Sequence, residues 1–326
     1  MPDTSPISDW QKEIAIACEQ YQPGVEPAGL YEPIRYILGL GGKRLRPVLV
    51  LAACDLMGGN PYDAIAPALG IELFHNFTLM HDDIMDQAPL RRNKATVHAR
   101  WNINTAILSG DAMLVKAYQQ FEACAPEVYG NVMKLFSKTA LEVCEGQQLD
   151  MDFEAREDVA LDEYMHMILM KTAVLLAASL KIGAYVADAS ERDADALYEF
   201  GLYNGLAFQL MDDWLDVFGD SGEVGKQVGG DILANKKTWF WLSVLKHGTE
   251  EQKALLKKWS AIHDQPDEKV AVIRDLFLSL SLDQMGLSEM KRYHQKAFQS
   301  LDSVSVPDER KEPMRSYFSA LLSRTK

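Results

Sequence analysis

The sequence predicts an all-α protein, and three observations indicate this class. Apolar residues recur at helical spacing through most of the 326 residues, as in Ala64–Asp86. No strand–turn–helix alternation and no Asn-Gly hairpin signal separate the apolar runs. The composition, with 48% hydrophobic and 25% charged residues, is that of an ordinary folded chain. We therefore expect one large helical domain over residues 1–326, with about the first eight residues flexible.

The predicted helices follow from turn signals and apolar periodicity along the chain. Glu32–Leu40 leads into the glycine pair of GGKRLRP. Pro47–Met57 is mostly apolar and ends at GGNP, which is a stop-and-turn signal. Ala64–Asp86 repeats apolar side chains every three or four residues. Further helices are expected over Thr105–Cys124, Glu127–Asp150, Asp162–Ala187, Arg192–Phe218 and Lys236–His247, and as amphipathic helices over Glu250–Lys326.

The chain is acidic, and this limits the classes of partner. Asp and Glu outnumber Lys and Arg by 47 to 33, which gives a formal net charge of −14. Nucleic acid is therefore not expected as a partner, because non-specific binding needs clustered cations. An anionic substrate must be held by local Lys and Arg side chains or by bound metal, against the overall field.

The sequence predicts neither a membrane span nor a secretory signal. The best apolar candidate, Thr172–Val186, is short and is interrupted by Lys181. The start of the chain, MPDTSPISDW, lacks both a basic segment and an apolar stretch. The four cysteines have no CxxC spacing, which favours small buried side chains in a reducing compartment. We expect a cytoplasmic protein.

Two acidic strings dominate the sequence, HDDIMD and DDWLD. On a helix, residues four apart share a face, so Asp82 pairs with Asp86 and Asp212 pairs with Asp216. Two like charges side by side destabilise a helix unless a cation lies between them. Carboxylate oxygens suit Mg²⁺, which binds one or two carboxylates together with substrate phosphates. The alternative is a solvated acidic face, but apolar residues precede both strings, FTLM the first and AFQLM the second.

The basic residues are grouped as well. Taken singly, each group is more typical of a solubilising helix end. Arg and Lys are also the side chains that recognise diphosphates. Two carboxylate sets together with two separate basic clusters imply two diphosphate groups, one metal-bound and one metal-free. The groups are Lys43, Arg44 and Arg46 in GGKRLRP, Arg91-Arg92 after the first acidic string, and Lys171, Lys226 and Lys236-Lys237.

The richest glycine cluster, Gly219–Gly230, predicts a mobile loop. It is not a Walker phosphate loop, because Gln227 follows Lys226 where Ser or Thr is required. We expect this loop to close over a bound diphosphate, with Lys226 as the contacting cation.

These motifs resemble those of the trans-isoprenyl diphosphate synthases, or polyprenyl synthetases, from about Leu30 to Trp239. HDDIMD resembles the first aspartate-rich motif, FQLMDDWLD the second, and GQQLD a further family motif that contains Gln147 and Asp150. The resemblance implies the isoprenoid synthase fold, a single bundle of about ten or more helices around a central cavity. It also implies a homodimeric prenyltransferase of isoprenoid biosynthesis.

The implied reaction is the head-to-tail condensation of isopentenyl diphosphate with an allylic diphosphate, which is the dimethylallyl, geranyl or farnesyl compound. The allylic C–O bond ionises, the isopentenyl double bond attacks the cation, and loss of a proton gives an all-trans product. Mg²⁺, Arg and Lys would stabilise the departing diphosphate. The released diphosphate can accept the proton, so the chemistry demands no protein general base.

The resemblance assigns roles to the residues that match the family's motifs. Asp82, Asp86 and Asp212 would bind about three Mg²⁺ ions, with Mn²⁺ as an alternative, supported by Asp83, Asp213 and Asp216. The allylic diphosphate would contact Arg91, Lys171, Lys226 and Lys236. The metal-free isopentenyl site matches Gly42, Lys43, Arg46, His75 and Arg92. The reacting carbons would be lined by Lys171, Thr172, Phe208 and Gln209.

The chain differs from two groups of farnesyl synthases, in the spacing of its first motif and in its C-terminal sequence. Two residues separate Asp83 from Asp86, whereas the common bacterial farnesyl synthases have four. The sequence ends SRTK without the basic tail of eukaryotic farnesyl synthases, so no contribution of the C-terminus to the isopentenyl site is expected.

Product length is predicted from the helix that carries Asp82. Thr78 lies about 6 Å before Asp82 along the helix axis, Phe77 about 7.5 Å and Phe74 about 12 Å. In the family, bulky residues four and five positions before the motif stop elongation early. Here the small Thr78 and the large Phe77 give a mixed case, which predicts a C20 product first and C15 second. The alternative is that both phenylalanines are ordinary core residues.

Three other functions are weighed against this one. A longer-chain synthase would share every motif. A class I terpene cyclase would share the fold and the first motif, but its second motif is usually of the Asn/Ser/Glu type, and it would not need GGKRLRP. A silent subunit of a heteromeric synthase should have lost aspartates, and this chain keeps all six.

Overall fold

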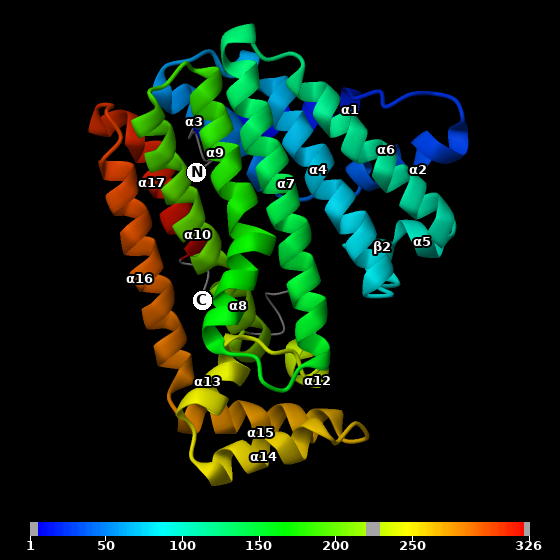
Figure 1. Ribbon diagram of the computed structural model, residues 1–326, viewed down its shortest axis with the longest axis vertical. Coiled ribbons are helices and arrows are strands. Elements are labelled where there is room, and N and C mark those ends of the chain that lie inside the picture. Colours follow the sequence, from blue (N-terminus) through cyan, green and yellow to red (C-terminus); the bar gives the residue numbers. More distant parts are fainter. Residues whose placement is uncertain (1–5, 220–228, 323–326) are drawn as a thin grey trace. The chain divides into compact units, whose positions relative to one another are not determined.

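The computed structural model describes residues 6–219 and 229–322, and these are almost entirely helical (Figure 1). The all-α prediction is confirmed. The described residues also contain one small hairpin of β1 (Leu90–Arg91) and β2 (Lys94–Ala95), paired antiparallel. Its two turn residues, Arg92 and Asn93, have φ values of 52° and 59°, the left-handed pair of a type I′ turn. This hairpin is not predicted by the sequence, because Arg-Asn is not an Asn-Gly signal.

The chain divides into two compact units, which are described separately. Unit 1 contains Met1–Ala140, Ala178–Tyr198 and Ser303–Met314. Unit 2 contains Leu141–Ala177, Glu199–Asp302 and Arg315–Lys326.

Unit 1 is built on α4, which packs along α6 and against α3. The α3 helix is buried on nearly all sides, which explains why its sequence is apolar without a polar face. Close backbone packing contributes here, because a Cβ at Gly183 would lie 2.1 Å from the Val50 carbonyl oxygen. Along the first segment of this unit, the helices are α1 (Pro6–Gln20), α2 (Ala28–Gly39), α3 (Leu45–Met57), η1 (Pro61–Ala64), α4 (Ile65–Met85), α5 (Val97–Arg100), α6 (Ile103–Phe121) and the start of α7 (Pro126–Ala155).

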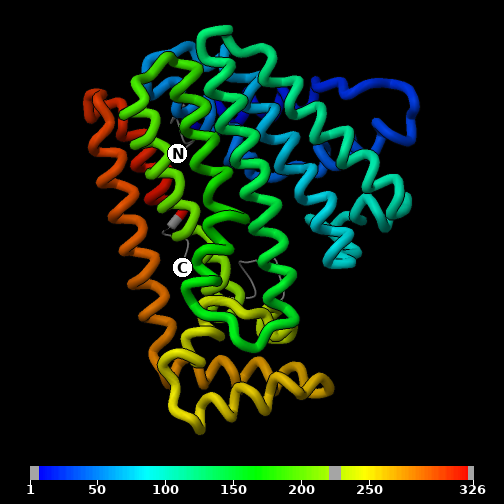
Figure 2. The backbone as a smooth tube through the Cα atoms, viewed as in Figure 1, coloured from blue at the N-terminus to red at the C-terminus, as the bar shows by residue number. Residues whose placement is uncertain are grey.

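Unit 2 has its own core, dominated by aromatic side chains such as Phe240, Trp259 and Phe277. The helices α14 and α15 pack side by side, as the tube in Figure 2 shows. The remaining elements of the chain are α8 (Leu161–Ile168), η2 (Leu169–Ala173), α9 (Val174–Val186), α10 (Glu191–Phe218), α12 (Gly230–Leu233), α13 (Trp239–His247), α14 (Glu250–Ser260), α15 (Pro266–Ser279), α16 (Leu282–Asp302) and α17 (Asp308–Leu322).

Two predicted helices differ from the structure. The continuous helix expected over Asp162–Ala187 is interrupted by a π-helical turn, η2. The helix expected from Lys236 begins only at Trp239, because Asn235 has a left-handed φ of 54° and the chain is extended at Thr238. Helical periodicity alone could not reveal either feature.

One helical stretch, Leu161–Val186, is long and apolar enough to cross a membrane by length and composition. The run from Thr172 alone is too short to predict such a stretch. In the structure, 83% of the most apolar window of Leu161–Val186 is buried inside the protein, as in the core helix of a globular fold.

The cysteines are more varied than predicted. Cys18 and Cys54 are buried, but Cys124 is only partly covered and Cys144 is exposed. All four are free thiols.

Candidate active site

The first aspartate motif closes α4 in unit 1. The Asp86 N–H donates to the Asp82 carbonyl at 2.9 Å, so these two residues lie one helical turn apart. Asp82 is partly exposed and Asp86 is exposed, whereas Asp83 is only 2% exposed. The outer pair of carboxylates is therefore accessible to a ligand, and the central one is not.

The buried Asp83 is compensated by Arg91 of β1. Arg91 Nε lies 2.9 Å from both carboxylate oxygens, and its guanidinium also approaches Oδ1 to 2.7 Å. Such a charge-assisted, forked contact is strong and fixes geometry. The structure thus brings together two residues for which the sequence predicts separate contacts, and it ties the hairpin to α4.

The residues that match the metal-free site form two contacts in unit 1. Arg46 Nη1 lies 3.2 Å from His75 Nε2, and because Arg only donates, the imidazole accepts. Burial, followed by the charges of Arg46 and Arg92, holds the pKa of His75 well below its usual value, so the ring is neutral. A Cβ at Gly42 would lie 2.5 Å from the Arg92 guanidinium, so only glycine allows this approach. Lys43 is exposed beside them.

A carboxyl group that sequence reasoning missed lies beneath these cations. Glu72 on α4 is only 4% exposed, and Asn76 Nδ2 donates to its Oε1 at 3.0 Å. Burial raises the pKa of Glu72, while Asn76 and Arg46 oppose that rise. The available signal was an acidic residue inside an otherwise apolar helical stretch.

The second motif lies on α10 in unit 2 and repeats the pattern of exposure. Asp212 is exposed and Asp216 partly exposed, whereas Asp213 is only 3% exposed. The Tyr164 hydroxyl donates to Asp213 Oδ2, and Gln209 Nε2 donates to Oδ1 at 3.3 Å. Burial and, second, the nearby Asp231 raise the pKa of Asp213 to about 7. Tyr164 and Asp231 carried no motif in the sequence and were not predicted.

The second motif also contacts the start of α12. The Asp231 N–H donates to Asp216 Oδ2 at 3.0 Å, and the Gly229 N–H donates to the Asp216 carbonyl at 2.7 Å. Carboxylates of Asp213, Asp216 and Asp231 are therefore gathered around one end of α10. Negative charge is concentrated here, although among the described residues these three side chains are not arranged to hold a metal ion by themselves.

Lys171 and Thr172 both lie in the π-helical turn η2, a type of distortion that is frequent at functional sites. Lys171 Nζ contacts Asp150 Oδ2 at 2.6 Å, and Thr172 Oγ1 donates to Gln209 Oε1 at 3.2 Å. One hydrogen-bonded chain thus links Thr172 through Gln209 to the second motif.

Two glycines hold η2 in place. A Cβ at Gly146 of α7 would lie 2.3 Å from the Lys171 backbone nitrogen, and a Cβ at Gly205 of α10 would lie 2.6 Å from Ala173 Cα. The π-helical backbone therefore packs between two helices at a distance that no larger residue permits.

The predicted chain-length residues belong to an aromatic group in unit 1. Phe74 is fully buried, with its ring 5.2 Å from that of Phe136 and 5.7 Å from that of Phe77. Phe77 is 8% exposed and stacks edge-on against His81 at 4.8 Å. Thr78 is partly exposed, and its hydroxyl donates to the His75 carbonyl at 2.8 Å.

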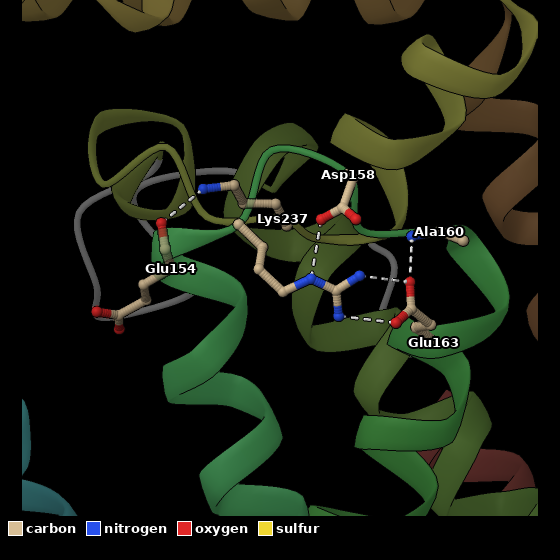
Figure 3. Close-up of polar contacts among 6 residues, drawn as sticks. Glu154, Asp158, Ala160, Glu163 and Lys237 are labelled. Atoms are coloured by element: carbon tan, nitrogen blue, oxygen red, sulfur yellow. Dashed lines mark hydrogen bonds and ion pairs between the residues drawn. The ribbon is translucent and has the colours of Figure 1, made fainter.

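The end of α7 is fixed by polar contacts (Figure 3). Lys237 Nζ donates to the Glu154 carbonyl at 3.0 Å. Arg156 contacts Asp158 at 2.9 Å and Glu163 at 2.8 Å, and Glu163 also accepts from the Ala160 N–H. Lys237 thus serves the fold, which distinguishes it from the exposed Lys236.

The remaining predicted residues are placed as follows. Phe208 and Gln147 are partly exposed on α10 and α7. Lys226 lies outside the described residues, as does most of the predicted loop. Within residues 6–219 and 229–322, no group of three His, Cys, Asp or Glu side chains is arranged to hold a metal ion by itself.

The all-α fold and the two DDxxD motifs agree with the class that the sequence predicts, a prenyltransferase. One family model matches most of the chain. The family model for polyprenyl synthetase matches residues 27–277, and the chain belongs to this family.

Individual relatives are similar over most of their length. The geranylgeranyl diphosphate synthase of Methanosarcina mazei is 39% identical over 246 residues, covering 75% of this chain and 76% of the relative. The geranylfarnesyl diphosphate synthase of Natronomonas pharaonis is 38% identical over 76% of this chain and 77% of its own. A crystal structure of a geranylgeranyl pyrophosphate synthase has a TM-score of 0.91 at 43% identity, covering 98% of both chains.

Proposed function

We propose that this enzyme condenses isopentenyl diphosphate with an allylic diphosphate, releases diphosphate and makes an all-trans product, chiefly C20 geranylgeranyl diphosphate with C15 second. One observation carries the proposal. The Gly42, Arg46, His75 and Arg92 set forms a cationic group in unit 1 in addition to the two DDxxD motifs. An enzyme with one diphosphate substrate has no need of this additional cationic set.

The family implies dependence on a divalent metal, and we assign the ions to Asp82, Asp86 and Asp212. Asp83, Asp213 and Asp216 support them. We propose Mg²⁺, about three ions per site, because hard oxygen donors prefer it. When bound, the metal neutralises the diphosphate that leaves.

Side chains of the protein bind the allylic diphosphate and line the reacting carbons. Arg91, Lys171, Lys226 and Lys236 hold the allylic diphosphate. Thr172 and Gln209, joined at 3.2 Å, present oxygen dipoles to the reacting carbons, with the ring of Phe208 beside them. The proton is lost to the released diphosphate, so no side chain is assigned as general base.

Product length is assigned to Phe77, Phe74 and Thr78. The buried aromatic group around Phe74 supports a floor, which is a set of bulky side chains that stops the growing prenyl chain. Relatives that make C20 and C25 products support an intermediate product length. Phe77→Ala should lengthen the product and Thr78→Phe should shorten it. Unchanged products in both variants would contradict the floor.

We also propose a cytoplasmic homodimer. On α6, the apolar side chains of Ile103, Ile107, Leu108 and Val115 are each 41–61% exposed. So much apolar surface on one helix supports burial against a second copy. Free thiols support a reducing compartment.

A product assay tests the function. The purified protein is incubated with labelled isopentenyl diphosphate, each allylic primer in turn and Mg²⁺, with EDTA controls. Metal-dependent C20 or C15 alcohol after dephosphorylation supports the proposal. Products of C30 or longer would still show a prenyl diphosphate synthase, but they would contradict the proposal that Phe77 limits chain length. Cyclic hydrocarbon formed without isopentenyl diphosphate would point to a cyclase, and no product at all to a silent subunit.

A further inference from the structure

A buried lysine in unit 2, Lys269 on α15, has no part in the reaction above. Only 1% of its surface is exposed. Burial lowers the pKa of its ammonium group, because a charge removed from water is destabilised. Lysine is almost never fully buried unless its ammonium group is paired. The groups that accept hydrogen bonds from this side chain therefore indicate its role.

The acceptors are neutral oxygens at the end of α12. Lys269 Nζ lies 2.7 Å from Asn235 Oδ1 and 3.4 Å from the Leu233 carbonyl oxygen. Within the described parts of the chain, it forms no ion pair with a carboxylate. The ammonium group therefore binds one backbone carbonyl that the end of α12 leaves without an intrahelical partner, at Leu233, and the side-chain amide oxygen of Asn235.

Asn235 is held from two directions. Its φ of 54° is a conformation that Asn adopts more readily than most residues. While its Oδ1 accepts from Lys269 on α15, its Nδ2 donates to the Ser260 carbonyl at the end of α14, at 3.0 Å. The neighbour of Lys269, Val270, packs on Gly229, where a Cβ would lie 2.8 Å from both valine methyl groups.

These anchors surround the segment that carries Lys236. The Lys236 N–H donates to the Asp231 carbonyl at 2.9 Å, and the next residue, Lys237, is tied to Glu154 (Figure 3). Asp231 in turn donates its N–H to Asp216 of the second motif. The backbone at Lys236 is thus held by the Asp231 carbonyl, the side chain of the next residue is anchored on α7, and the same short segment contacts a predicted metal ligand.

We propose that Lys269 is a positioning residue, which acts through Asn235 to hold Lys236 and Asp216 where they bind the metal-bound allylic diphosphate. This rests on the proposed function. Lys269 belongs to unit 2, whereas the residues assigned to isopentenyl diphosphate belong to unit 1. Its loss should therefore weaken binding of one substrate and leave the other unaffected.

Two variants test this, with one matched control. Lys269→Met removes the donor, and Asn235→Gly removes the acceptor while keeping a residue that tolerates positive φ. Lys258→Met, at an exposed lysine of α14, is the control. Both test variants should raise the KM for the allylic diphosphate about tenfold or more, as loss of an outer-shell partner does, while the KM for isopentenyl diphosphate stays within about twofold.

Calorimetry with Mg²⁺ and inorganic diphosphate gives a readout that does not depend on turnover. The Kd for diphosphate should rise about tenfold in both variants and stay unchanged in Lys258→Met. An unchanged Kd in a folded Asn235→Gly protein would overturn the proposal, as would an equal rise in both KM values with a lowered unfolding midpoint. If the wild type makes no prenyl product, the proposed function fails, but the diphosphate titration still tests Lys269.

Discussion

The two aspartate motifs share the pattern DDxxD, yet the buried central carboxylate is compensated differently in each unit. Asp83 in unit 1 accepts from a cation, the forked guanidinium of Arg91. Among the described residues, Asp213 in unit 2 accepts from the neutral donors Tyr164 and Gln209, and its pKa is raised to about 7. The pattern therefore fixes which carboxylates are accessible, whereas the surrounding fold decides how the hidden one is stabilised.

The largest effect should come from the accessible carboxylates, and it should be the same in both motifs. Asp82→Asn and Asp212→Asn should each lower the rate of product formation about 100-fold or more, because each removes charge that stabilises the leaving diphosphate. Initial rates with labelled isopentenyl diphosphate at saturating Mg²⁺ measure this. Asp264→Asn, at an exposed loop residue, should leave the rate unchanged. A large loss in one motif only would break the equivalence of the two accessible sets.

The next effect separates the motifs. Arg91→Met leaves the Asp83 carboxylate buried without its cation and should lower the free energy of unfolding by about 3 kcal/mol. Tyr164→Phe removes one neutral donor from Asp213 and should cost about 1–2 kcal/mol. Urea denaturation measures both. The double variant Asp83→Asn/Arg91→Met should recover more than half of the loss, and equal costs for the two single variants would remove the distinction.

The π-helical turn beside the second motif gives a steric test. Gly146→Ala would put a Cβ 2.3 Å from the Lys171 backbone nitrogen, which overpacks the site and should cost about 1–3 kcal/mol. Gly130→Ala on the same helix meets nothing within 4 Å and should stabilise the protein by up to about 1 kcal/mol. Thermal unfolding of the pair measures the difference. Similar midpoints for the two variants would mean that α7 does not pack this closely on η2.

The smallest effect concerns pH and the cationic set of unit 1. Because the folded-state pKa of His75 lies well below 6.5, only the unfolded chain gains a proton there as the pH falls below about 6.5. Stability that is present above this pH is therefore lost below it, by at most about 1.4 kcal/mol per pH unit. In denaturant titrations between pH 7.5 and 5.5, the free energy of unfolding of His75→Gln should therefore fall less steeply with decreasing pH than that of the wild type. His263→Gln, at an exposed histidine, should keep the wild-type slope.

Sequence reasoning succeeded where periodicity and residue type determine the structure. It predicted the helical class and placed both aspartate motifs on helices. It could not find Tyr164, since a buried tyrosine looks like any helix residue until its neighbours are known, and it overlooked Glu72 although an acidic residue inside an apolar helical stretch was a usable signal. It also missed η2, because a π-helical turn changes backbone hydrogen bonding without changing the pattern of apolar side chains.

The π-helical turn makes the number of residues in this part of unit 2 as important as their identity. Lys171 faces Gly146 and Ala173 faces Gly205, so the interval between these two contacts is a fixed count. Removing Thr172 would bring the branched Val174 to the place where the methyl group of Ala173 just fits. Substitutions here can be graded by size, but a single deletion or insertion shifts every later contact at once. Among related sequences, gaps should therefore be absent from this stretch even where the residues themselves vary.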